Sequence, residues 1–174
     1  SRVIAAWDLY NNNPQPFTTL PSGSDGDEEG AGHATHVTNI AAGSVVNGNS
    51  YYGMAPEADI VMVPNDLSDD NIMKGAKFIK QTAEAAGKPW VLNLSIGSSM
   101  GPHDSTTPYD VAMSNLCGSG GVMVAAMGNE AQDQQHVFLQ FQKAGDVRYI
   151  LNSPSDDQCS CYLWGTEADG KAHV

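Results

Sequence analysis

Apolar and polar positions alternate with a helical period in one long stretch of the chain. From about 69 to 86, apolar residues recur at steps of three and four, which predicts a helix with one buried stripe. The cap is expected at Asp69, Asp70 or Asn71, and Gly87 is expected to end the helix. Shorter helices are predicted at about 33–43 and 107–117.

Between these helices lie short apolar runs that predict strands. They span residues 2–7, 60–63, 90–95 and 122–126. The near-continuous apolar character of the last two predicts strands that are buried on both faces. Strands that alternate with helices through short loops predict an α/β fold with a parallel sheet. Functional residues in such sheets collect at the carboxyl ends of the strands, where Ser95 and Asn129 fall.

The pattern of apolar segments changes after about residue 131. Residues 9–32 are expected to be loop, and residues 1–131 are expected to form a parallel core. Beyond it, short apolar segments at 137–141, 147–151 and 161–164 predict a distinct β element. We therefore divide the chain into a core at 1–131 and the start of a β-rich insertion or partial β domain at 132–174.

Composition narrows the classes of partner and compartment. The chain has 174 residues and a formal net charge of −12, which disfavours nucleic acid and anionic membrane as partners. No apolar run approaches the roughly 20 residues that span a bilayer. Three cysteines, two of them only two positions apart, do not form a disulfide framework. The chain opens directly in an apolar strand without a signal peptide, so we expect a fragment whose apolar sheet edges favour self-association.

A candidate chemical site begins at residues 32–37, which read Gly-His-Ala-Thr-His-Val. An acidic, glycine-rich loop precedes this segment, and an apolar helical stretch follows it. This arrangement brings His33 to the start of a helix, where its imidazole can face a cleft. The alternatives are that His33 and His36 are ordinary polar residues, or a metal pair at His-x-x-His spacing without a third ligand motif nearby.

Three segments in order resemble the subtilisin-like serine peptidase family. Residues 32–43 are similar to its histidine motif, and residues 52–58 resemble the Gly-Val-Ala-Pro segment that follows it. Residues 93–98 and 124–130 are similar to the substrate-binding strand and to the oxyanion-hole turn of the family. The resemblance covers about residues 1–131 and implies a three-layer parallel sheet with helices on both faces, here partial. The later β-rich stretch resembles anaerobe-type subtilases with an inserted β domain.

The resemblance implies a role for several residues. His33 would be the general base, His36 would be structural, and Asn129 would donate to the oxyanion. Backbone groups of Ser95, Ile96 and Gly97 would pair with an extended peptide substrate. In a subtilisin, the loss of the corresponding side-chain amide costs about 10²–10³ in turnover, which sets the scale expected for Asn129.

The resemblance implies catalysis by a Ser/His/Asp triad, and two of its members are not evident in the sequence. The Gly-Thr-Ser-Met-Ala motif that carries the nucleophilic serine is absent from this chain. Asp8 ends an apolar run upstream of His33 and is one candidate for the aspartate. Alternatively, residues 1–8 resemble the strand after the aspartate loop. The resemblance therefore implies that this chain is an excised middle piece of a serine endopeptidase. We expect this piece by itself not to hydrolyse peptides.

Departures from the family motifs support an alternative function. Ala34 and Asn39 replace glycines, and Met127 replaces a small residue beside the oxyanion turn. The chain would then be a degenerate subtilase, a pseudoprotease that binds peptides or regulates a partner. A doubly wound ligand-binding domain is a third reading, but residues 9–32 lack the phosphate loop it requires.

The resemblance also implies an environment. The intact protein would be extracellular or at the cell surface, and its partner would be a peptide or protein substrate. No cofactor is required by the chemistry. Calcium is common in the family, but the asparagine-rich turn at 47–50 carries an extra residue, so no calcium site is assigned.

Overall fold

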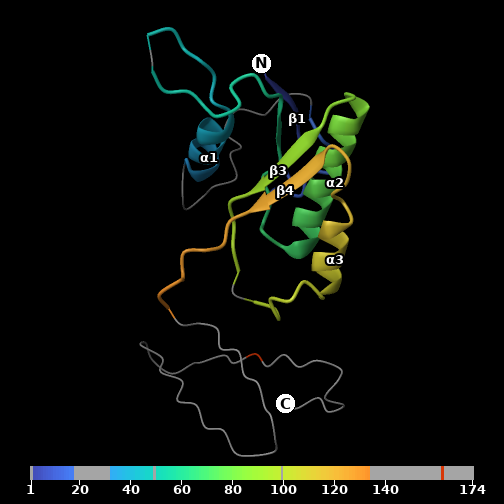
Figure 1. Ribbon diagram of the computed structural model, residues 1–174. Helices are drawn as coiled ribbons and strands as arrows, with labels where there is room; N and C mark the ends of the chain where they lie inside the picture. The colour runs from blue at the N-terminus through green and yellow to red at the C-terminus, as the bar shows by residue number, and fades with distance from the viewer. Residues whose placement is uncertain (1, 18–31, 49, 99, 134–161, 163–174) are drawn as a thin grey trace, which may run out of the picture.

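The computed structural model describes residues 2–17, 32–48, 50–98, 100–133 and 162. Strands and helices alternate along the chain, and none of the described helices is long and apolar enough to cross a membrane. In chain order the elements are β1 (Val3–Ala6), α1 (His33–Ala42), β2 (Ile60–Met62), α2 (Asp69–Ala85), β3 (Trp90–Leu94), α3 (Pro108–Ser114) and β4 (Gly121–Ala125) (Figure 1). These elements confirm the α/β prediction, although α3 ends earlier than expected. The predicted β-rich strands lie outside the described residues.

The strands form two parallel pairs. β1 pairs with β2, and β3 pairs with β4 in unbroken register from Trp90 beside Gly121 to Leu94 beside Ala125. The sequence predicts one parallel sheet, whereas the described ladders form two separate two-stranded sheets. In Figure 1, α2 and α3 lie along one side of the β3–β4 pair and α1 lies on the other side.

The start of α2 is set by a serine. Ser68 is the cap, and its hydroxyl accepts a hydrogen bond from the Asn71 amide at 3.4 Å. The expectation of a cap at Asp69, Asp70 or Asn71 is therefore wrong, because Ser68 has the extended backbone that a cap needs. The two aspartates instead occupy the first turn, where the positive end of the helix dipole stabilises their negative charge.

One face of α2 builds the main core. Ile72 and Ala76 of the predicted stripe are buried together with two residues of β3 and one of α3, namely Trp90, Leu92 and Met113. The opposite flank of α2 reaches the other strand pair, since Phe78 meets the Trp7 ring edge-on at a centroid distance of 5.5 Å. The backbone of α2 also comes close to Val63, after β2: a Cβ at Gly75 would lie 2.8 Å from Cγ1 of Val63. α2 therefore contacts both pairs.

The face of the β3–β4 pair away from this core is exposed. Val91 is 67% exposed, Val122 54% and Val124 51%. The prediction that these strands are buried on both faces is therefore wrong for the described chain, because α2 and α3 cover only one face. Three valines in this position form an apolar patch, which we call the valine face.

α1 is held at its carboxyl end by backbone hydrogen bonds from a loop. Gly53, Met54 and Ala55 donate their amides to carbonyls at the end of α1, namely those of Gly43 at 3.0 Å, Ile40 at 3.0 Å and Ala41 at 2.8 Å. These bonds satisfy carbonyls that a helix end leaves without an intrahelical partner. The guanidinium of Arg2 donates to the Ala42 carbonyl and places a cation at the negative end of the helix.

The absence of a side chain at Gly53 allows the loop to approach the end of α1 closely. Replacing Gly53 tests whether the backbone hydrogen bonds from this loop, which we call the anchor of α1, stabilise the fold. A Cβ at Gly53 would lie 2.2 Å from the Gly43 amide nitrogen and 2.6 Å from that of Ala42. We expect Gly53→Ala to lower the free energy of unfolding by about 1–3 kcal/mol, measured by urea denaturation, because helix and loop must move apart. Gly118→Ala is the matched control, since nothing lies within 4 Å of a Cβ there, and its change should stay within about 0.5 kcal/mol. Equal stabilities of the two variants would contradict the anchor.

Candidate functional site

His33 lies at the first residue of α1 and faces the end of β3. Gly32 precedes it in the left-handed region, with φ of 114°, and no side chain caps the helix. The imidazole is exposed, and its Nε2 lies 3.3 Å from the Ser95 carbonyl oxygen. Nε2 donates to this oxygen in the tautomer that carries the hydrogen on Nε2, whereas the tautomer with the hydrogen on Nδ1 leaves Nε2 able to accept a proton. His33 begins a helix, as the sequence predicts, and the structure brings it to the carboxyl end of β3.

Residues 95–97 continue directly from β3. The Ser95 hydroxyl accepts a hydrogen bond from the Asn93 side-chain amide at 2.9 Å. The Ile96 side chain packs partly buried against the core, and Gly97 is exposed. This segment is thus anchored on one side by the core and open at Gly97, where backbone groups meet solvent.

Asn129 lies in the turn that follows β4. The Ala126 amide donates to the Leu94 carbonyl at 2.9 Å, which extends the β3–β4 pairing up to this turn. Gly128 has φ of 92°, a conformation that favours glycine. A Cβ built at Gly97 would lie 3.5 Å from the Gly128 Cα, so the two loops touch. His33, Ser95, Gly97 and the Asn129 turn therefore lie around one end of the β3–β4 pair.

Asp8 lies at the carboxyl end of β1, where a turn surrounds its carboxylate. The residue is 3% exposed. Asn11 donates its backbone amide at 3.0 Å and its side-chain amide at 2.7 Å, and the Asn13 side-chain amide donates at 3.3 Å. These bonds support a structural role, and the assignment of Asp8 to a triad stays a prediction.

The loop between β3 and α3 carries a carboxylate in a tight local turn. His103 and Ser105 both have left-handed backbones, with φ of 56° and 63°. Asp104 lies between them, and the Thr106 hydroxyl and amide donate to its carboxylate at 2.6 and 3.0 Å. These bonds, the hydroxyl first, hold the pKa of Asp104 below its ordinary value. These hydrogen bonds therefore favour the charged form of Asp104.

The described residues offer little for a metal ion. No group of three or more His, Cys, Asp or Glu side chains within them is arranged to hold one. His36 follows His33 by one turn of α1 and is exposed. Residue 49 of the turn at 47–50 lies outside the described residues, so calcium there stays untested. Two of the three cysteines also lie outside them, and Cys117 is an exposed free thiol.

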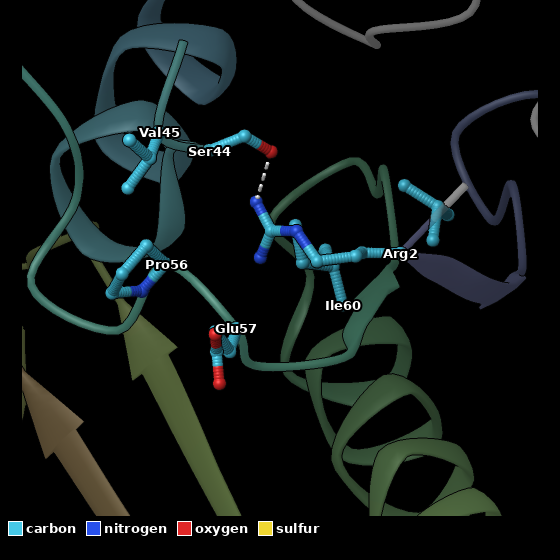
Figure 2. A pocket seen from close by; sticks show the side chains of 7 residues that line it. Arg2, Ser44, Val45, Pro56, Glu57 and Ile60 are labelled. Carbon is cyan, nitrogen blue, oxygen red and sulfur yellow. Dashed lines mark hydrogen bonds between the residues drawn. The ribbon is translucent and has the colours of Figure 1, made fainter. Parts of the chain in front are cut away.

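A surface hollow lies where the start of β1 meets the end of α1 (Figure 2). Arg2 crosses it and donates to the Ser44 hydroxyl and to the Ala58 carbonyl, each at 2.8 Å. Since the guanidinium also donates to the Ala42 carbonyl, Arg2 joins three backbone segments. Arg2 therefore has a structural role in this hollow, where it holds the end of α1 against the start of β1.

Glu130 is a residue to which sequence reasoning gave no role. Its carboxylate Oε2 accepts a hydrogen bond from the Asn129 amide at 2.8 Å. The one signal in the sequence is that an acidic residue directly follows a glycine and an asparagine after a predicted strand. That signal predicts a turn, but not the direction of the side chain.

Comparison with known proteins identifies a family for most of the chain. Residues 8–149 match the model of the Subtilase family. Thermitase of Thermoactinomyces vulgaris is 25% identical over 170 residues, an alignment that covers 97% of this chain and 54% of thermitase. Subtilisin of Bacillus sp. strain TA39 is 32% identical over 137 residues, covering 73% of this chain and 31% of that protein.

A solved structure agrees with the sequence comparisons. The CspB protease of Clostridium perfringens superposes with a TM-score of 0.63 at 25% sequence identity. The match covers 76% of this chain and 31% of the CspB chain. The chain thus spans about half the length of thermitase and less than a third of the other two proteins.

The turn around Asp8 gives a direct test of its role. We expect Asp8→Ala to lower the free energy of unfolding by about 1–3 kcal/mol in urea denaturation, because three donors lose a charged acceptor in a mostly buried place. Asp133→Ala, at an exposed aspartate, is the control and should change it by no more than about 0.5 kcal/mol. An unchanged stability of Asp8→Ala would contradict the structural role.

Proposed function

The chain belongs to the Subtilase family, and we propose that it supplies the general base and the oxyanion-hole donor of a serine endopeptidase. His33 accepts the proton of the attacking serine, and the Asn129 side-chain amide stabilises the oxyanion of the tetrahedral intermediate. The backbone of Ser95, Ile96 and Gly97 receives the peptide substrate as an added strand. The substrates of the intact enzyme are peptides or proteins.

The contact between His33 and Ser95 carries this proposal. It joins α1 to the end of β3, with 3.3 Å between Nε2 and the carbonyl oxygen. The Asn129 turn lies at the same end of the strand pair through the contact of Gly97 with Gly128. A base, a strand edge for the substrate and an amide donor are therefore available within one region.

The nucleophile comes from elsewhere in the intact protein. The 174 residues contain no Gly-Thr-Ser-Met-Ala motif, and the chain spans 54% or less of the relatives compared above. The triad aspartate is either Asp8 or a residue outside these 174. Since a histidine base has no catalytic effect without its serine, this chain alone does not hydrolyse peptide bonds.

A degenerate subtilase is the second candidate. Asn39 replaces a glycine of the motif, and its Oδ1 lies 2.3 Å from where a Cβ of Gly43 would be. Its side chain thus occupies space at the end of α1 that a glycine leaves open. Met127, beside the oxyanion turn, is 100% exposed. In this version the same strand edge binds peptides without cutting them.

The environment follows from the proposed activity. The intact protein acts outside the cell or at its surface, and it needs no cofactor for proton transfer; calcium is common in the family, and no site for it is assigned in this chain. The anaerobe-type branch with an inserted β domain is the placement we favour within the family. A structural match to a clostridial protease supports it.

Labelling of the full-length protein by a fluorophosphonate, which reacts with activated serines, tests the peptidase proposal. We expect the full-length protein to be labelled and its His33→Ala variant to lose labelling, because the serine is then no longer deprotonated. His36→Ala is the matched control, since His36 is also exposed and lies one turn along the same helix. Its labelling should be retained. No labelling of a full-length protein that circular dichroism shows to be folded would overturn the peptidase proposal in favour of the degenerate subtilase.

We also expect this chain to self-associate through its valine face. Val91, Val122 and Val124 expose apolar surface, whereas a parallel sheet is ordinarily covered on both faces. The net charge of −12 opposes association, so the mass measured by light scattering should rise above 18.4 kDa as salt screens the charge. Val91→Lys with Val124→Lys should restore the monomer. Val111→Lys, at a 47% exposed valine of α3, should not. A monomer at every salt concentration would refute the expectation.

A further inference from the structure

The turn after β4 is closed by the side chain of its own last residue. The Glu130 carboxylate folds back so that Oε2 accepts the Asn129 amide hydrogen at 2.8 Å. The same oxygen would lie 2.6 Å from a Cβ at Gly128. The φ of 92° therefore favours glycine at 128, and a side chain there would displace the end of the Glu130 side chain.

Two further contacts limit the movement of this turn. The Glu130 carbonyl accepts the Asp133 amide at 3.0 Å, which turns the chain immediately after Glu130. On the other side, Gly97 from the β3 loop packs against Gly128. The turn at Gly128 and Asn129 thus contacts both the Glu130 carboxylate and the loop that follows β3. We call the hydrogen bond from the Asn129 amide to the Glu130 carboxylate the clasp.

We propose that Glu130 is a positioning residue that fixes the Asn129 backbone through this clasp. A hydrogen bond with an ionised acceptor is stronger than one between neutral groups. Here it holds the backbone amide of Asn129, whose side chain is the proposed oxyanion donor. Donors at an oxyanion site contribute most when they are held in place before the reaction. This inference takes its catalytic meaning from the proposed function, whereas the clasp itself is a property of the chain.

Hydrogen exchange of the Asn129 amide with water tests the clasp without any activity. In this 174-residue chain, we expect Glu130→Ala to speed that exchange on the order of fivefold to tenfold, measured by NMR. Glu130→Gln keeps an acceptor oxygen and should retain most of the protection. Glu57→Ala, at another exposed glutamate, is the control and should leave the Asn129 amide unchanged. Unchanged exchange in Glu130→Ala would overturn the clasp, as would equally faster exchange throughout β4.

The catalytic role is read from steady-state kinetics of the full-length protein. We expect Glu130→Ala to lower kcat roughly tenfold with KM little changed, and Glu130→Gln to restore most of kcat. An unchanged kcat in Glu130→Ala, alongside faster exchange at Asn129, would overturn the positioning role. A full-length protein that is folded but inactive would instead refute the proposed function, and the exchange experiment would still decide the clasp.

Discussion

Segments that are far apart in the chain meet because β3 and β4 run parallel and in register. Leu94 lies beside Ala125, so both strands end at the same edge and the chain leaves them at one place. A shift of one residue would turn the alternating side chains to opposite faces and would displace the two loops relative to one another. Residues 95–97 therefore meet the Asn129 turn because the five residues of β3 pair with the five residues of β4 without a break.

α2 gives this pairing its support. Two-stranded sheets are marginal in water, and each pair here gains a hydrophobic partner from a different flank of one helix. Phe78 packs on Trp7 from the β1–β2 side, while Ile72 and Ala76 pack on Trp90 from the β3–β4 side. The two pairs are thus held relative to one another by side chains of α2, without a ladder between them among the described residues.

The sequence predicted these elements well because each has a local signal. The period of α2 and the segment around His33 are local patterns, and strand ends in α/β folds collect functional residues for topological reasons. The exposure of Val91 was not predictable, since an apolar run reports composition and not whether a helix covers it. The division into two strand pairs depends on distant backbone contacts. Ser68 was missed because several good capping residues follow it, and Glu130 because a turn sequence does not fix a side-chain direction.

α1 has ten residues, fewer than the roughly 12–15 at which an isolated helix becomes even marginally stable in water. It persists because Arg2 and the loop that starts at Gly53 occupy its terminal carbonyls. Helix and loop therefore form one unit of local unfolding, which opens and closes as a whole. In a genetic screen for loss of the proposed peptidase activity, substitutions at Gly53 would group with those at His33. The imidazole would be intact in such alleles, but the helix that presents it would be lost.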